Sequence, residues 1–89
     1  MEDEVVMDVR EHVMAGIVRT RLGEDRRTGG QPIDVLVADG DIYLLGHVDS
    51  DDQRQAANLI VTGIVGVRQI VDHLVVRIRK PETDLTAVR

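Results

Sequence analysis

The chain lacks cysteine, phenylalanine and tryptophan, and it has a single tyrosine and two prolines among its 89 residues. Without cysteine, neither a disulfide framework nor a thiolate metal site can form. Without large aromatic rings, the core must be aliphatic, and nucleic-acid bases would find no stacking platform. The length suits one small domain, which we place at residues 1–80, with residues 81–89 as a disordered tail.

Charge and hydrophobic runs exclude further classes. The net charge of −5 argues against a broad nucleic-acid or anionic-lipid footprint, so we expect no nucleic-acid partner. No apolar run approaches the roughly 18 residues that a transmembrane segment needs. The acidic start, Met1-Glu2-Asp3-Glu4, is the opposite of the basic opening of a signal peptide, so we expect a cytoplasmic protein.

Apolar spacing predicts a first helix over residues 3–22, followed by a polar, flexible loop over residues 23–32 that holds three glycines and a proline. Because valines are weak helix formers, this helix needs packing against another element to be stable. Its expected buried stripe consists of Val6, Val9, Val13 and Ile17, widened by Met14, Val18 and Leu22.

Two alternating runs, 33–38 and 41–48, flank Asp39-Gly40, which predicts a β-hairpin with a type I′ turn. That turn fixes the register. The pairs Val37–Ile42, Val35–Leu44 and Ile33–Gly46 then share one side of the sheet, and Leu36–Tyr43 and Asp34–Leu45 share the other.

Ser50 and Gln53 form a capping-box pattern that predicts a second helix running to about Thr62, with Gly63 as its stop. The β-branched run over 67–79 predicts a long third strand. The expected order is therefore α-β-β-α-β. The fold class is α+β: a two-layer α/β sandwich in which two helices cover one face of a three-stranded sheet.

In this order and spacing the chain resembles the BON domain, named for bacterial osmotic-shock and nodulation proteins. The resemblance covers about residues 5–79. The matching residues are Asp39-Gly40, Leu44, Gly46, Val48, Ser50, Ala56, Ala57, Gly66-Val67, Ile70 or Val71, Leu74 and Val76.

The resemblance implies a binding or interaction module that attaches to phospholipid surfaces or recognises small solutes, with no catalytic residues to carry over. BON domains often occur in exported proteins or in tandem. This sequence shows no signal peptide, second copy or lysin motif, which favours a cytoplasmic role over a periplasmic stress role. The matching residues Gly40, Gly46, Ser50 and Gly66 are expected to be structural, with Gly40 serving the turn and Gly46 allowing close helix-on-sheet packing.

Patterns that could carry chemistry have simpler explanations. His12, His47 and His73 could approach one another, but a metal site needs three or four ligands in defined geometry, and exposed strand histidines are the simpler explanation. The acidic run 49–52 lacks the alternation of a calcium loop. The run 63–66 formally matches a GxxG nucleic-acid loop, but its two middle residues are apolar. The only serine is used by the helix cap, and no nucleophile has a partnered base. We expect no enzyme activity, metal or cofactor.

Two candidate binding sites remain. The first, which we prefer, is the sheet face opposite the helices, where large apolar groups suggest self-association or docking of a partner protein. Partial cover by the N- or C-terminal segment, or an ordinary apolar-rich surface, would also explain them. These residues are Leu36, Tyr43, Leu45, Val71 and Val75.

The alternative is the basic end of the first helix and its loop, with Arg19, Arg21, Arg26 and Arg27, which could bind a phospholipid headgroup or another anion. Helix-dipole complementation and a solvated loop would also explain these arginines, and we favour that explanation.

Overall fold

The computed structural model describes residues 6–77, and it has the expected order α-β-β-α-β. The elements are α1 (Val9–Glu24), β1 (Ile33–Ala38), β2 (Asp41–Val48), α2 (Asp51–Thr62) and β3 (Gln69–Val76). The predicted tail 81–89 and the first residues of the predicted first helix, 3–5, lie outside the described part of the chain.

The turn between β1 and β2 has the predicted geometry. Asp39 and Gly40 both adopt positive φ, at 53° and 86°, as a type I′ turn requires. The antiparallel register therefore follows the prediction, with Val37 opposite Ile42 and Leu36 opposite Tyr43. This register divides the hairpin's side chains between the two faces of the sheet.

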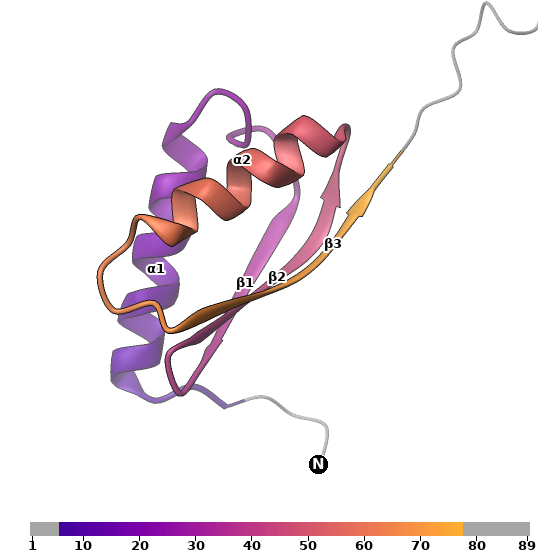
Figure 1. Ribbon diagram of the computed structural model, residues 1–89. Helices are drawn as coiled ribbons and strands as arrows, with labels where there is room; N and C mark the ends of the chain where they lie inside the picture. Colours follow the sequence, from indigo (N-terminus) through magenta and orange to yellow (C-terminus); the bar gives the residue numbers. More distant parts are fainter. Residues whose placement is uncertain (1–5, 78–89) are drawn as a thin grey trace, which may run out of the picture.

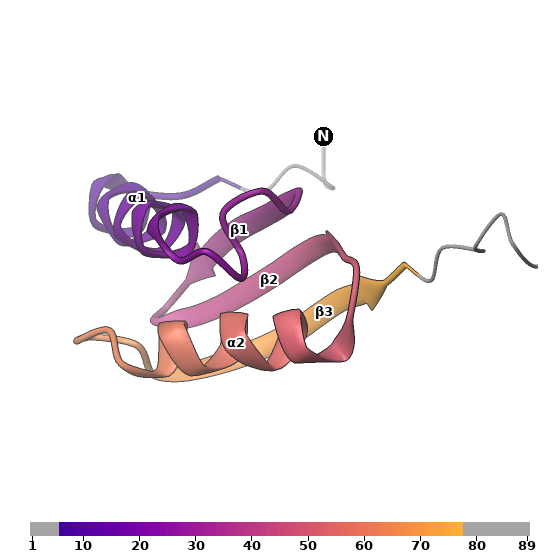
Figure 2. The same cartoon turned by 90° about the horizontal axis from the view of Figure 1, so that it is seen from above.

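The sheet has the order β1-β2-β3, with β3 parallel to β2 and Ile42 opposite Ile70. Helix α2 makes the crossover between the two parallel strands, and both helices lie on the same side of the sheet (Figures 1 and 2). The result is the predicted two-layer α+β sandwich. Its hydrophobic core consists of Ala15, Val18, Leu22, Val35, Val37, Ile42, Leu44, Val48, Ala57, Val61, Ile64 and Leu74.

Helix α1 starts later than predicted and buries a different face. It begins at Val9, because Asp8 caps it: Asp8 Oδ1 accepts from the Glu11 N–H, and Glu11 Oε1 accepts from the Asp8 N–H. The buried helical positions are Ala15, Val18 and Leu22.

The predicted valine stripe instead faces outward, with Val9, Val13 and Ile17 at 78%, 57% and 40% exposure. Val6 precedes the helix and is also exposed. The main predicted stripe is thus wrong, whereas Val18 and Leu22, which were predicted to widen it, are buried, and Met14 packs against the core. The sequence contains two apolar stripes on opposite sides of the same helix, and hydrophobic spacing alone does not choose between them.

Helix α1 also covers the outer edge of β1. The Val35 carbonyl accepts from Arg19 Nη2 at 3.3 Å, and the Val37 N–H donates to Met7 Sδ at 3.4 Å. Just past the strand, the Asp39 N–H donates to Glu11 Oε2 at 2.9 Å. Side chains of α1 and its N-terminal approach thus satisfy outward-facing backbone groups on this edge.

Helix α2 ends as predicted at Thr62, with Gly63 as its C-cap. At its start the Ser50 hydroxyl accepts from the Gln53 N–H, but the Gln53 amide oxygen accepts from the N–H of Asp49 instead of Ser50. Strand β3 is shorter than predicted and runs from Gln69 to Val76.

Gly46 is structural for a different reason from the one predicted. It has φ +109°, and a Cβ there would lie 2.1 Å from the Pro32 carbonyl oxygen. The close approach therefore involves the backbone that enters β1, and no helix is among the nearest atoms. Gly66 also has a positive φ, +97°, but its close neighbour is a side chain of α1, because a Cβ would lie 2.8 Å from Met14 Cε.

We predict opposite effects for two glycine-to-alanine substitutions. Gly46→Ala should lower the free energy of unfolding by at least ~2 kcal/mol, because the new methyl group meets backbone at a positive φ. Gly16→Ala should raise it by ~0.5–1 kcal/mol, because this position lies inside α1 with open space around it. Urea unfolding measures both, and equal effects of the two substitutions would contradict this explanation.

Candidate binding surface: the open sheet face

The sheet face opposite the helices carries an apolar row that crosses all three strands. Tyr43 lies opposite Leu36 on β1 and opposite Val71 on β3. One step along β2, Leu45 has Asp34 and His73 as its neighbours, and Val75 lies beside His47. The register therefore brings the five predicted face residues together on one surface. We call this surface the open face: Leu36, Tyr43, Leu45, Val71 and Val75.

The open face is apolar in its middle and polar around it. Leu36, Tyr43, Leu45 and Val71 are partly buried, and Val75 is 54% exposed. The polar residues Asp34, His47, Asp41 and Gln69 lie around this centre by register. The open face thus has an apolar centre and a polar rim.

Two ion pairs connect β2 and β3 at the two ends of these strands. At one end Arg68 contacts Asp41, with Nε and Oδ1 3.1 Å apart, and Gln69 Nε2 donates to Asp41 Oδ2 at 3.2 Å. At the other end Arg77 contacts Asp49 at 3.2 Å. These exposed pairs contribute little to stability, about 0–1 kcal/mol each, but they join β3 to both ends of β2.

The histidines do not form a site. His47 and His73 share the open face on neighbouring strands, whereas His12 lies on α1. Within residues 6–77, no group of three or more histidine, aspartate or glutamate side chains is placed to hold a metal ion.

The four arginines of the alternative site have different surroundings. Arg19 donates to the Val35 carbonyl, and Arg27 forms a two-point ion pair with Asp25. Arg21 lines a separate shallow groove beside Val13 and Ile17. Arg26 is exposed in the loop. In the structure, two of the four cations are thus already partnered within the chain.

The loop after α1 is organised around a buried threonine. The Thr28 hydroxyl donates to the Leu22 carbonyl at 2.6 Å, so it caps the helix end from within the loop. The helix itself continues to Glu24, two residues past its predicted end. The predicted flexibility of residues 23–32 stays a prediction.

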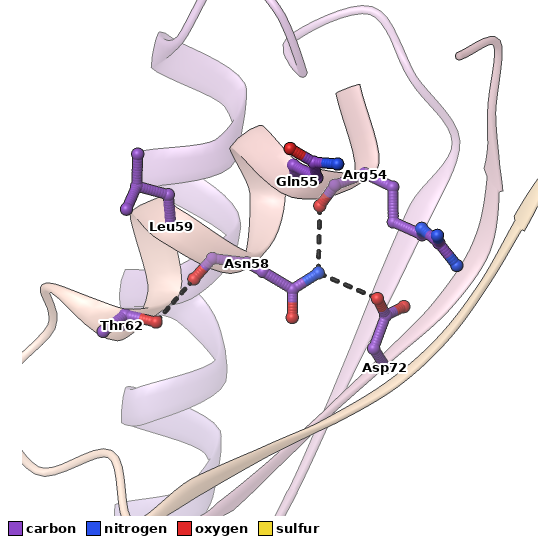
Figure 3. Close-up of a pocket in the computed structure, with 6 residues that line it drawn as sticks. All are labelled: Arg54, Gln55, Asn58, Leu59, Thr62 and Asp72. Atoms are coloured by element: carbon purple, nitrogen blue, oxygen red, sulfur yellow. Dashed lines mark hydrogen bonds between the residues drawn. The ribbon is translucent and has the colours of Figure 1, made fainter. Parts of the chain in front are cut away.

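Sequence reasoning missed a groove beside α2. It has a volume of ≈ 460 Å³ and lies between the outer side of the helix and β3. In Figure 3, Asn58 reaches Asp72, and Nδ2 and Oδ2 are 2.9 Å apart. The available signal was Leu59, an apolar residue on an otherwise polar helix side, which is 66% exposed. The lining residues are Arg54, Gln55, Asn58, Leu59, Thr62 and Asp72.

One known protein family matches the sequence over most of its length. The sequence profile of the BON domain matches residues 11–78, which is most of the chain and includes every helix and strand apart from the first two residues of α1. The chain belongs to the BON domain family. No curated protein matches it.

BON domains are binding modules for phospholipids or partner proteins, and the family is generally non-catalytic. In this BON domain, none of the helices within residues 6–77 is long and apolar enough to cross a bilayer. The acidic residues Asp51 and Asp52 lie in the first turn of α2, where the helix dipole favours negative charge. That placement supports the capping explanation of the acidic run.

The Asp25–Arg27 pair makes a testable contribution to pH dependence. The side-chain hydrogen bond from Arg27, helped by the Arg27 backbone N–H, lowers the pKa of Asp25 to about 2. Since the folded pKa lies below the unfolded value of about 3.9, the pair stabilises the fold above that pH and the effect is lost as pH falls toward 2.

We predict that Arg27→Met raises the Asp25 titration midpoint from about 2 toward ~3.9, while the remaining backbone N–H keeps it below that value. Carboxyl ¹³C shifts followed by NMR against pH measure this midpoint. The neighbouring Arg26→Met is the matched control and should leave it unchanged. A wild-type midpoint near ~4 would contradict the ion pair.

Proposed function

We propose that this BON domain is a non-catalytic interaction module whose open face binds an apolar protein surface, either on another copy of the chain or on a partner protein. The observation that carries the proposal is the apolar row Leu36–Tyr43–Val71, which crosses all three strands on the side that no described helix covers. Sheets with one solvated face normally place polar residues there.

The composition of the open face supports a protein ligand. Tyr43 is the only aromatic residue of the chain, and it occupies the middle strand at the centre of the row. Tyrosine is favoured at the centre of binding surfaces because its ring buries a large area while its hydroxyl keeps a hydrogen-bond partner. The rim residues Asp34 and His47 would remain solvated around such a contact.

The basic end of α1 offers weaker support for the alternative, phospholipid or small-solute binding. Arg19 and Arg27 would have to give up their contacts with Val35 and Asp25 before they could bind an anion. Of the four arginines, only Arg21 and Arg26 could bind an anion without first losing such a contact, and one lies on α1 and the other in the loop.

We predict that Tyr43→Glu and Leu36→Glu each weaken partner binding or self-association at least ~10-fold, because each places a charge at the centre of a desolvated contact. Sedimentation of the purified chain and pull-down with an identified partner measure the effect. Thr20→Glu introduces the same charge on the exposed side of α1 and should bind like wild type. Circular dichroism confirms that all three variants are folded.

The same set of proteins tests the alternative. If a wild-type chain that neither self-associates nor captures a partner floats with anionic vesicles, and Arg26→Glu/Arg27→Glu abolishes the flotation, the open-face proposal is wrong. Flotation that is absent, or unchanged by the two substitutions, removes the support for the arginine site.

A further inference from the structure

The two edges of the sheet differ. On the β1 edge, Arg19, Met7 and Glu11 bind outward-facing backbone groups, as described above. The β3 edge has no covering element within the described residues (Figure 2). An uncovered strand edge presents N–H and C=O groups that can pair with another strand.

Two hydrogen bonds show which groups of β3 face outward. The Arg77 N–H donates to the Val48 carbonyl at 2.7 Å, so odd-numbered residues direct their N–H groups toward β2. The Leu74 N–H donates to Asp72 Oδ1 at 2.9 Å instead, because it points away from β2. The direction of the backbone N–H and C=O groups alternates along a strand. The residues whose backbone groups point away from β2 are therefore Ile70, Asp72, Leu74 and Val76.

We propose that β3 pairs antiparallel with β3 of a second copy, and so joins two three-stranded sheets into one sheet of six strands. The pairing places His73 opposite the partner copy's equivalent residue on a two-fold axis. Among the outward-facing residues, Ile70 then pairs with position 76 of the second copy and Asp72 with position 74.

Among residues 69–77, this register places no carboxylate opposite a carboxylate and no arginine opposite an arginine. On the open face, Val71 lies opposite position 75 of the second copy, and Gln69 lies opposite position 77. Aliphatic pairs such as Val71 with position 75 stabilise adjacent strands. A shifted register that placed the two Asp72 carboxylates opposite each other would be repulsive. The described part of β3 is thus self-complementary in one register.

Charge complementarity across the seam comes from the groove beside α2. Helix α2 runs antiparallel to β3, and the Asn58–Asp72 hydrogen bond sets their relative heights. Arg54 lies four residues earlier, or ~6 Å along the helix, which equals about two residues of strand. Arg54 is therefore level with Leu74, and Leu74 pairs with position 72 of the second copy.

Each Arg54 then reaches the Asp72 carboxylate of the other copy, which gives two equivalent ion pairs. Both groups can exchange partners at low cost. The Arg54 side chain is held only by an exposed pair with Asp51, which contributes little to stability. Asp72 Oδ1 leaves the Leu74 N–H when that group pairs with the second strand. Leu59, exposed in the isolated chain, is covered by the second copy's α2.

This inference does not depend on the proposed function, because the seam uses the strand edge and leaves the open face free. The two open faces would instead become one continuous surface. A dimer formed through the open face and one formed through the edge therefore respond to different substitutions.

The test uses the full chain in sedimentation equilibrium over a range of concentrations. We expect dimerisation, and we expect Arg54→Glu and Asp72→Lys each to weaken it at least ~10-fold. An equimolar mixture of the two variants should recover wild-type association, because each copy then supplies the charge that the other needs. Arg21→Glu, on exposed α1, is the matched control and should associate like wild type.

Amide hydrogen exchange gives a second readout, which remains if Asp72→Lys does not fold. The outward-facing N–H groups of Ile70 and Val76 should gain protection as concentration rises, while those of Val71 and Val75 should be protected throughout. A chain that stays monomeric overturns the inference. So does protection of Ile70 that is independent of concentration. A dimer that Tyr43→Glu dissociates and Arg54→Glu does not also overturns it, while supporting the open face.

Discussion

The two positive φ angles at Asp39 and Gly40 determine the organisation of the whole sheet. These two residues alone connect the strands, so the turn fixes which β2 residue lies opposite each β1 residue. Because side chains alternate strictly along a strand, that single choice sends Val35 and Val37 to the core and Leu36 to the open face. A slip of one residue would exchange the two faces of the hairpin.

A second constraint is the way α1 is held. Its valines and two glycines lower its intrinsic helicity, and its buried stripe consists of small or medium side chains such as Ala15 and Val18. Polar contacts with the β1 edge complete its attachment: Glu11 bonds both its own N-cap and the Asp39 N–H, so one carboxylate joins the start of the helix to the hairpin turn. The first helix of this chain is thus fixed to an edge of the sheet as well as to a face.

The hairpin, its register and the five residues of the open face could be predicted from the sequence, because turn chemistry and a period of two determine them without tertiary information. The buried face of α1 could not. Val9, Val13 and Ile17 fit helical spacing as well as Ala15, Val18 and Leu22 do, so spacing predicted the burial of Val18 and Leu22 but also that of three residues that face outward. The capping box at Asp8 was readable in the sequence and would have set the helix start. The Gly46 explanation failed because no local pattern shows that the Pro32 carbonyl approaches so closely.

The contacts that cover the β1 edge limit how the chain can polymerise at high concentration. A sheet that exposes hydrogen-bonding groups on both sides can add subunits without end, as in cross-β fibres. Here the side chains of Met7, Glu11 and Arg19 occupy one side, so growth could proceed in a single direction and would terminate after one addition. The covered β1 edge therefore protects this valine-rich chain against open-ended growth by strand addition.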